Sequence, residues 1–156
     1  FGQMREKEWF SAGHSLNIAE IFDHFFGLTI CYDLRFPEIY RCYAKFRPHF
    51  FLVPSQWPSI RIMHFKKLLS ARSIENQAFM ISANAVGKTG NIYFGGNSIV
   101  TDYMGEIVLD MQNKVDEVGS VIVNTGPMNK WREDFPVLDD LHSIEKMNIE
   151  ITKTRK

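Results

Sequence analysis

The sequence has few cysteines, no net charge and no long hydrophobic run. Its 156 residues include two cysteines, Cys31 and Cys42, too few for the disulfide framework of a small secreted domain, which favours a reducing, cytoplasmic location. No stretch approaches the roughly 20 apolar residues that span a bilayer, so we expect no membrane partner. With 18 basic and 18 acidic residues, the chain lacks the positive charge that recruits nucleic acid, and a small molecule or another protein is the expected partner.

Metal and phosphate sites are not indicated either. The chain has five histidines: His14, His24, His49, His64 and His142. Their spacing is not that of metal ligands, so we expect neither a metal nor another cofactor. The glycines at 87–90 and 95–96 are too isolated for a phosphate loop and are typical of turns. Residues 1–156 have the length of a single domain, and because the first residue is Phe rather than Met, we expect this domain to be part of a longer protein.

The most informative stretch surrounds Cys31, where an apolar run gives way to a helix signal. Residues 26–30 are apolar and partly β-branched, which predicts a buried parallel strand, and Pro37 is typical of a first helical turn. Cys31 therefore falls at the carboxyl end of a strand, the edge of an α/β sheet where catalytic groups collect. A following helix would lower the pKa of its thiol. Alternatively, Cys31 is a small buried side chain, as we expect for Cys42, which we predict to pack on the helix.

Hydrophobic periodicity predicts an α/β fold. A helix over 37–46 between strands at 26–30 and 50–53 would form a βαβ unit with parallel strands. The remaining predicted elements are a strand at 15–22, a helix at 60–77, a strand at 79–85, a flexible loop at 86–91, a hairpin of 98–101 with 106–109, a strand at 118–123 and a helical turn at 130–133. If the strands before and after the helix pair, residues 54–58 lie next to Cys31.

Three spaced motifs resemble the nitrilase superfamily of carbon-nitrogen hydrolases. They are Cys-Tyr-Asp-Leu-Arg-Phe-Pro-Glu at 31–38, Ala-Arg-Ser-Ile-Glu-Asn-Gln at 71–77 and Gly-Gly-Asn-Ser at 95–98. Tyr-Asp after the cysteine is similar to the amidase branches, whereas true nitrilases usually carry Trp-Glu there. Within those branches, Pro-Ser-Gln-Trp-Pro at 54–58 with His64 resembles the ω-amidase type, which hydrolyses 2-oxoglutaramate and similar amides.

The resemblance implies a four-layer αββα sandwich that commonly dimerises through helices, of which this chain would be the carboxyl-terminal portion. It also implies a Glu-Lys-Cys triad that hydrolyses an amide through a cysteine thioester. Cys31 matches the nucleophile, and the backbone N–H of Tyr32 matches one oxyanion donor. Glu6 matches an additional glutamate that helps to position the substrate and the lysine. The lysine and the glutamate base themselves would precede Phe1, so we expect this chain alone to be inactive.

Candidate substrate-binding residues are Arg35, Phe36 and Trp57. The planar guanidinium of Arg35 suits a substrate carboxylate, but it could equally form a structural ion pair with Asp33 or Glu38. Trp57 is either a pocket wall over the substrate or a core aromatic at a strand end.

Three alternatives stay open at the level of the sequence. One is an inactive binding subunit that keeps the fold without the triad. Another is a hydrolase for a carbamoyl compound or deaminated glutathione, and a third is a truncated chain that misfolds because apolar surface is left uncovered.

Overall fold

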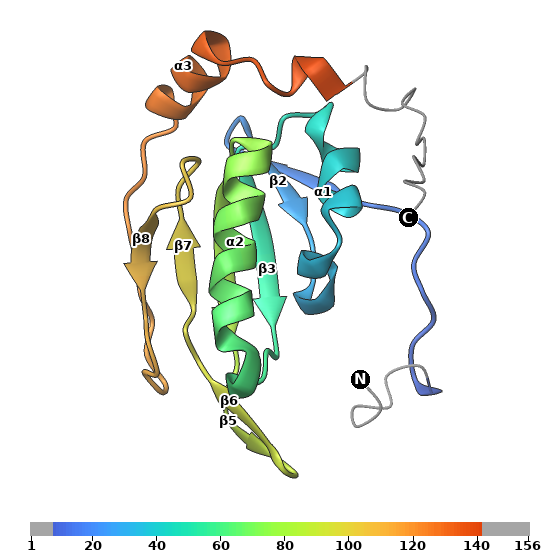
Figure 1. The fold of residues 1–156 in the computed structure, drawn as a ribbon, viewed down its shortest axis with the longest axis vertical. Coiled ribbons are helices and arrows are strands. Elements are labelled where there is room, and N and C mark those ends of the chain that lie inside the picture. Colours follow the sequence, from blue (N-terminus) through green and yellow to red (C-terminus); the bar gives the residue numbers. More distant parts are fainter. Residues whose placement is uncertain (1–7, 142–156) are drawn as a thin grey trace, which may run out of the picture.

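A six-stranded mixed sheet forms the centre of the computed structural model, which describes residues 8–141. Its strands run in the order β1 (Ile18–Ile21), β2 (His24–Leu28), β3 (Phe50–Ser55), β4 (Phe79–Asn84), β7 (Ile99–Thr101) and β8 (Ile107–Asp110) (Figure 1). β2, β3 and β4 are parallel, whereas the outer pairings are antiparallel. This arrangement confirms the predicted parallel βαβ unit and the hairpin of β7 with β8.

Helices cover one face of this sheet. α1 (Pro37–Ala44) follows a short 3₁₀ helix, η2 (Cys31–Arg35), and α2 (Ile62–Asn76) follows another, η3 (Ser59–Arg61). α1 and α2 lie side by side on the same face (Figure 1). The α/β class is therefore confirmed, with α1 and α2 forming a helix layer on one face of the six-stranded sheet.

Alternating side chains divide the core between the two faces of the sheet. Phe51 and Met80 pack in the cluster beneath α1 and α2, while their neighbours Phe50 and Phe79 pack on the other face with Met128 of α3 (Gly126–Asp134). β2 approaches β3 closely at Gly27, where an added Cβ would lie 2.5 Å from the ring of Phe51. Glycine is needed there because no side chain fits between the strand and that ring.

Two of the predicted secondary-structure elements are wrong. The expected flexible loop at 86–91 is instead a hairpin of β5 (Val86–Thr89) with β6 (Ile92–Gly95), turning through Gly90 at φ +57°. All residues of β5 are exposed, so no hydrophobic period marks it. The expected strand at 118–123 is irregular, because β-branched residues form a strand only where another strand pairs with them, and none does in the described part of the chain. The helical turn expected at 130–133 belongs to the longer α3.

Candidate active site

Cys31 begins the turn that links β2 to α1. It lies beyond the carboxyl end of β2, is partly buried against the core cluster, and has a left-handed backbone with φ +42°. This conformation is uncommon for a residue other than glycine and persists only where the surroundings hold it. A cysteine in a sharp turn at a strand end is typical of a nucleophile.

Asp33 closes the Cys31 turn with two hydrogen bonds to one residue. Its carboxylate accepts the backbone N–H of Ile30 at 2.9 Å, and its own N–H donates to the Ile30 carbonyl at 2.9 Å. Asp33 was not among the sequence candidates for the site. The sequence indicates its role only through its position three residues after Ile30, the last residue of the apolar run, which is the spacing of a capping box.

Two tyrosines of α1 hold the chain just before Cys31. Tyr43 donates its hydroxyl to the Leu28 carbonyl at 2.7 Å, and the Tyr40 hydroxyl lies 3.0 Å from Thr29 Oγ1. Because Thr29 Oγ1 itself donates to the Leu52 carbonyl, Tyr40 is the donor in its bond to Thr29. Burial raises the pKa of both Tyr40 and Tyr43, so both stay protonated donors. These bonds fix the end of β2 against α1 and β3.

Asn84 ties the loops at the carboxyl ends of β3 and β4 together. Its side chain accepts the N–H of Trp57 at 2.6 Å and donates to the Gly96 carbonyl at 2.5 Å. Its own N–H donates to Ser98 Oγ at 2.9 Å. The Gly-Gly-Asn-Ser motif therefore lies beside the Trp57 loop, although about 40 residues separate them in the sequence. The sequence analysis did not identify Asn84. Its position as a polar residue at the end of an apolar strand is the one feature of the sequence that indicates a role.

Arg35 stacks on Trp57 and does not form the structural ion pair that the sequence left open. The centre of its guanidinium lies 4.6 Å from the centroid of the Trp57 rings. Among residues 8–141, neither Asp33 nor Glu38 forms a salt bridge with it. Trp57 is 3% exposed and donates its indole N–H to the Arg61 carbonyl at 2.8 Å. It is a core aromatic, and its ring supports the Arg35 side chain.

Phe36 and Tyr32 are exposed aromatics at the rim of the same turn. Their rings meet edge to face with centroids 5.1 Å apart, and each is about two-fifths exposed, at 40% and 39%. The structure thus brings Cys31, Tyr32, Arg35, Phe36 and Trp57 to one edge of the sheet. Glu6 lies outside the described residues. Cys42 is exposed on α1, so the prediction that it packs is wrong.

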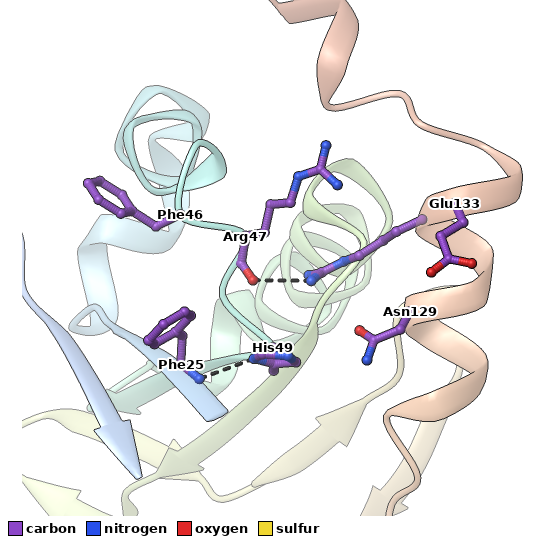
Figure 2. Close-up of a pocket in the computed structure, with 7 residues that line it drawn as sticks. Phe25, Phe46, Arg47, His49, Asn129 and Glu133 are labelled. Carbon is purple, nitrogen blue, oxygen red and sulfur yellow. Dashed lines mark hydrogen bonds between the residues drawn. The ribbon is translucent and has the colours of Figure 1, made fainter. Parts of the chain in front are cut away.

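The described residues also contain a cavity, at the opposite edge of the sheet. Its volume is about 360 Å³, and its lining includes Phe25, His49 and residues of α3 (Figure 2). Because Phe25 and His49 stand at the amino ends of β2 and β3, this cavity is remote from Cys31. Arg132 beside it donates to the carbonyls of Gln77, Arg47 and Pro48. We therefore assign this cavity no part in the chemistry of Cys31.

Neither a metal site nor a membrane span is found in the described part of the chain. No three His, Cys, Asp or Glu side chains within 8–141 are grouped to hold a metal ion. None of the helices described there is long and apolar enough to cross a membrane.

The comparisons with known proteins identify the family. The family model for carbon-nitrogen hydrolases matches residues 2–133. The chain belongs to the carbon-nitrogen hydrolase family. This confirms the resemblance to the nitrilase superfamily, and the match includes all three motifs.

Relatives within this family are named as amidases. The 2-oxoglutaramate amidase of Paenarthrobacter nicotinovorans is 40% identical over 114 residues, which are 73% of this chain and 38% of that protein. The deaminated glutathione amidase of Dictyostelium discoideum is 32% identical over 139 residues, 88% of this chain and 48% of that protein. The chain spans about half the length of the curated relatives it matches, or less.

Solved structures of carbon-nitrogen hydrolases share the fold. A superfamily protein from Xanthomonas campestris, which carries an arsenic adduct in its active site, superposes with a TM-score of 0.81 at 27% identity. That similarity covers 97% of this chain and 58% of the other. The described sheet and helices therefore form part of a nitrilase-like fold.

Proposed function

We propose that this chain carries the nucleophile of an enzyme that hydrolyses a small carboxamide to an acid and ammonia. The observation that carries the proposal is Cys31, held in a left-handed turn at the carboxyl edge of the sheet in a chain of this family. The Cys31 thiolate attacks the amide carbon, and the tetrahedral intermediate expels ammonia as the amide nitrogen takes up a proton. Water then attacks the resulting thioester, which releases the acid and restores the thiol.

The turn also supports a role for Tyr32 in stabilising the intermediate. Tyr32 follows Cys31 directly within η2, so its backbone N–H is proposed as a donor to the developing oxyanion. Such a donor contributes about 3 to 4 kcal/mol in enzymes where one has been removed.

Arg35 is the proposed receptor for a second carboxylate of the substrate. Its guanidinium is stacked on the buried Trp57, which limits its freedom, and none of the salt bridges found among residues 8–141 includes it. A planar, preoriented guanidinium suits a bidentate carboxylate contact. Phe36 at the rim is proposed to contact the apolar carbons between the two ends. These features favour a small α-keto dicarboxylate monoamide such as 2-oxoglutaramate.

The base and the lysine of the triad are proposed to come from outside these 156 residues. The resemblance to the family implies a glutamate base and a lysine preceding Phe1, with Glu6 as a supporting carboxylate. Because the chain spans about half the length of its relatives, the activity is proposed for the complete protein.

We further propose that the complete protein works in the cytoplasm as a homodimer. The scarcity of cysteine supports the compartment, and the resemblance to the family supports the dimer. Sedimentation equilibrium tests the assembly, since a monomer at micromolar concentration would contradict it.

Replacement of Cys31 tests the mechanism. In the complete protein, Cys31→Ala should lower ammonia release from 2-oxoglutaramate by at least about a thousandfold, because the thioester cannot form. Cys42→Ala is the matched control, and we expect it to keep full activity because Cys42 is exposed on α1. Unchanged ammonia release in Cys31→Ala would contradict the mechanism.

A substrate panel tests the specificity. Deaminated glutathione and a carbamoyl compound should react more slowly than 2-oxoglutaramate. The similarity to a deaminated glutathione amidase makes that substrate the second candidate. An intact fold with no activity on any of the three would instead favour a binding subunit.

A further inference from the structure

A buried arginine of α2 contacts the turn that presents Cys31. Arg72 is 4% exposed, and its Nε donates to the backbone carbonyl of Leu34 at 3.2 Å. Leu34 lies within η2, three residues after Cys31. A buried charge is costly unless it is paired, and Arg72 Nη1 is paired with Glu75 Oε2 at 2.8 Å.

The Leu34 carbonyl needs such a donor because Pro37 lies three residues after it. In a 3₁₀ helix each carbonyl accepts the N–H of the residue three positions later. For Leu34 that residue is Pro37, which has no N–H. Arg72 therefore supplies the hydrogen bond that the proline cannot, and it does so from a different helix.

Arg72 also lies against the residue that holds the other side of the turn. Its guanidinium carbon is 5.6 Å from the centroid of the Tyr40 ring, and the Tyr40 hydroxyl bonds Thr29, two residues before Cys31. Arg72 thus makes contacts that fix the chain before and after Cys31, the residue with the left-handed backbone.

We propose that Arg72 is a positioning residue for Cys31. By fixing the Leu34 carbonyl and packing on Tyr40, it holds the turn in the conformation that aims the thiol and the Tyr32 N–H at the substrate. This inference rests on the proposed amidase function, because it assigns Cys31 the role of nucleophile.

The test compares Arg72→Lys with Arg132→Lys in the complete protein. Lysine keeps the charge but cannot bond Leu34 and Glu75 at once with a rigid fork. We expect Arg72→Lys to lower kcat by at least about tenfold with KM changed by less than about threefold. Arg132 is also buried and bonds backbone carbonyls, but at the remote edge, so Arg132→Lys should lower Tm without lowering kcat.

Alkylation of the thiols by iodoacetamide gives a readout that needs no substrate. The rate is followed on the Cys31 peptide by mass spectrometry across pH, with exposed Cys42 as the internal reference. In Arg72→Lys, the alkylation of Cys31 should slow by about fivefold at neutral pH, because the turn no longer holds the thiol in its place before α1. The rate at Cys42 should not change.

Each outcome decides the proposal. Equal kcat and equal Cys31 alkylation in wild type and Arg72→Lys would overturn it, as would an equal loss of kcat in Arg132→Lys. If Arg72→Lys does not fold, Glu75→Gln replaces it, because this change removes the ion pair of Arg72 while leaving Arg72 itself in place. A smaller decrease in both kcat and the rate of Cys31 alkylation supports the positioning role, and no change in either refutes it. If wild type hydrolyses no amide, the proposed function fails, and the alkylation profile still decides whether Arg72 positions Cys31.

Discussion

At the scale of single residues, the backbone of Cys31 has a consequence for stability. A φ of +42° costs a residue with a Cβ more than it costs glycine. We therefore expect Cys31→Gly to be more stable than Cys31→Ala by about 1 kcal/mol. Urea denaturation of the complete protein measures the difference.

Cys42 provides the control for this comparison. It lies within α1, where glycine should be less stable than alanine by about 1 kcal/mol. The order of the two substitutions should therefore reverse between the two cysteines. The same order at both positions would mean that the Cys31 turn relaxes once the thiol is removed.

The stacked guanidinium of Arg35 leads to a prediction about substrate binding. Arg35→Lys should raise KM for 2-oxoglutaramate by about ten- to a hundredfold, because an ammonium neither stacks flat on Trp57 nor binds a carboxylate with two parallel bonds. Steady-state kinetics with this substrate, and with a neutral monoamide that lacks the second carboxylate, measure the effect.

The neutral monoamide is the internal control for Arg35. Its KM should stay within about threefold of the wild-type value, since it has no carboxylate to lose. Arg41→Lys is the matched variant, because Arg41 donates to the Glu75 carbonyl away from Trp57. An equal rise in KM for both substrates would show that Arg35 supports the pocket without binding the carboxylate.

At the scale of elements, the side-chain amide of Asn84 joins two loops at the edge of the sheet near Cys31. Asn84 ends β4 and bonds both the Trp57 loop and the Gly96 segment. Asn84→Ala should lower the free energy of unfolding by about 2 to 3 kcal/mol, because it leaves buried backbone groups without partners. Chemical denaturation measures the loss, and hydrogen exchange should show faster exchange at the Trp57 amide.

Exposed Asn129 of α3 is the matched control for Asn84. Asn129→Ala should leave stability within about 0.5 kcal/mol of wild type, since it removes no buried bond. A similar small effect at Asn84 would mean that the two loops hold their places without this amide.

At the scale of the whole molecule, α3 lies beside the amino ends of β2 and β3, at a corner lined by Arg47, His49 and residues of α3 (Figure 2). Burial and nearby Arg47 lower the pKa of Arg132 to about 10, so it is still charged at neutral pH. Burial, Arg132 and His24 lower the pKa of His49, whose Nδ1 accepts the N–H of Phe25 at 3.1 Å. Exposed Glu133 lines the same cavity.

This corner predicts a dependence of stability on pH. The pKa of His49 is lower in the folded protein than its unfolded value near 6.5, so the unfolded chain binds the proton more readily. The stability that neutral His49 contributes to the folded protein is therefore complete above about pH 6.5 and is lost as the pH falls through the pKa of His49 in the folded state. His49→Gln should flatten the fall in urea midpoint from about pH 7.5 to 5.

The exposed His14 is the control for His49. His14→Gln should leave the pH dependence as in wild type. If the urea midpoint falls equally with pH in His49→Gln and in wild type, protonation of His49 does not contribute to the loss of stability at acidic pH.

The sequence by itself determined the elements around the nucleophile. The apolar run before Cys31, the proline at the start of α1 and the run at β3 are local signals, because strand and helix formation depend on side-chain spacing and on the fixed φ of proline. The motifs at 31–38, 71–77 and 95–98 determined the family for the same reason, since they are read without knowing any contact.

The tertiary structure alone decided which groups meet. Arg35 stacks on Trp57, and Asn84 bonds Gly96, because strand pairing brings together loops that are distant in the sequence. The same dependence on distant partners explains why 118–123 is rich in valine and isoleucine, as strands are, and yet is irregular. Spacing along a chain carries information about neighbours in one element, whereas hydrogen bonds and ring contacts between elements depend on how the sheet is assembled.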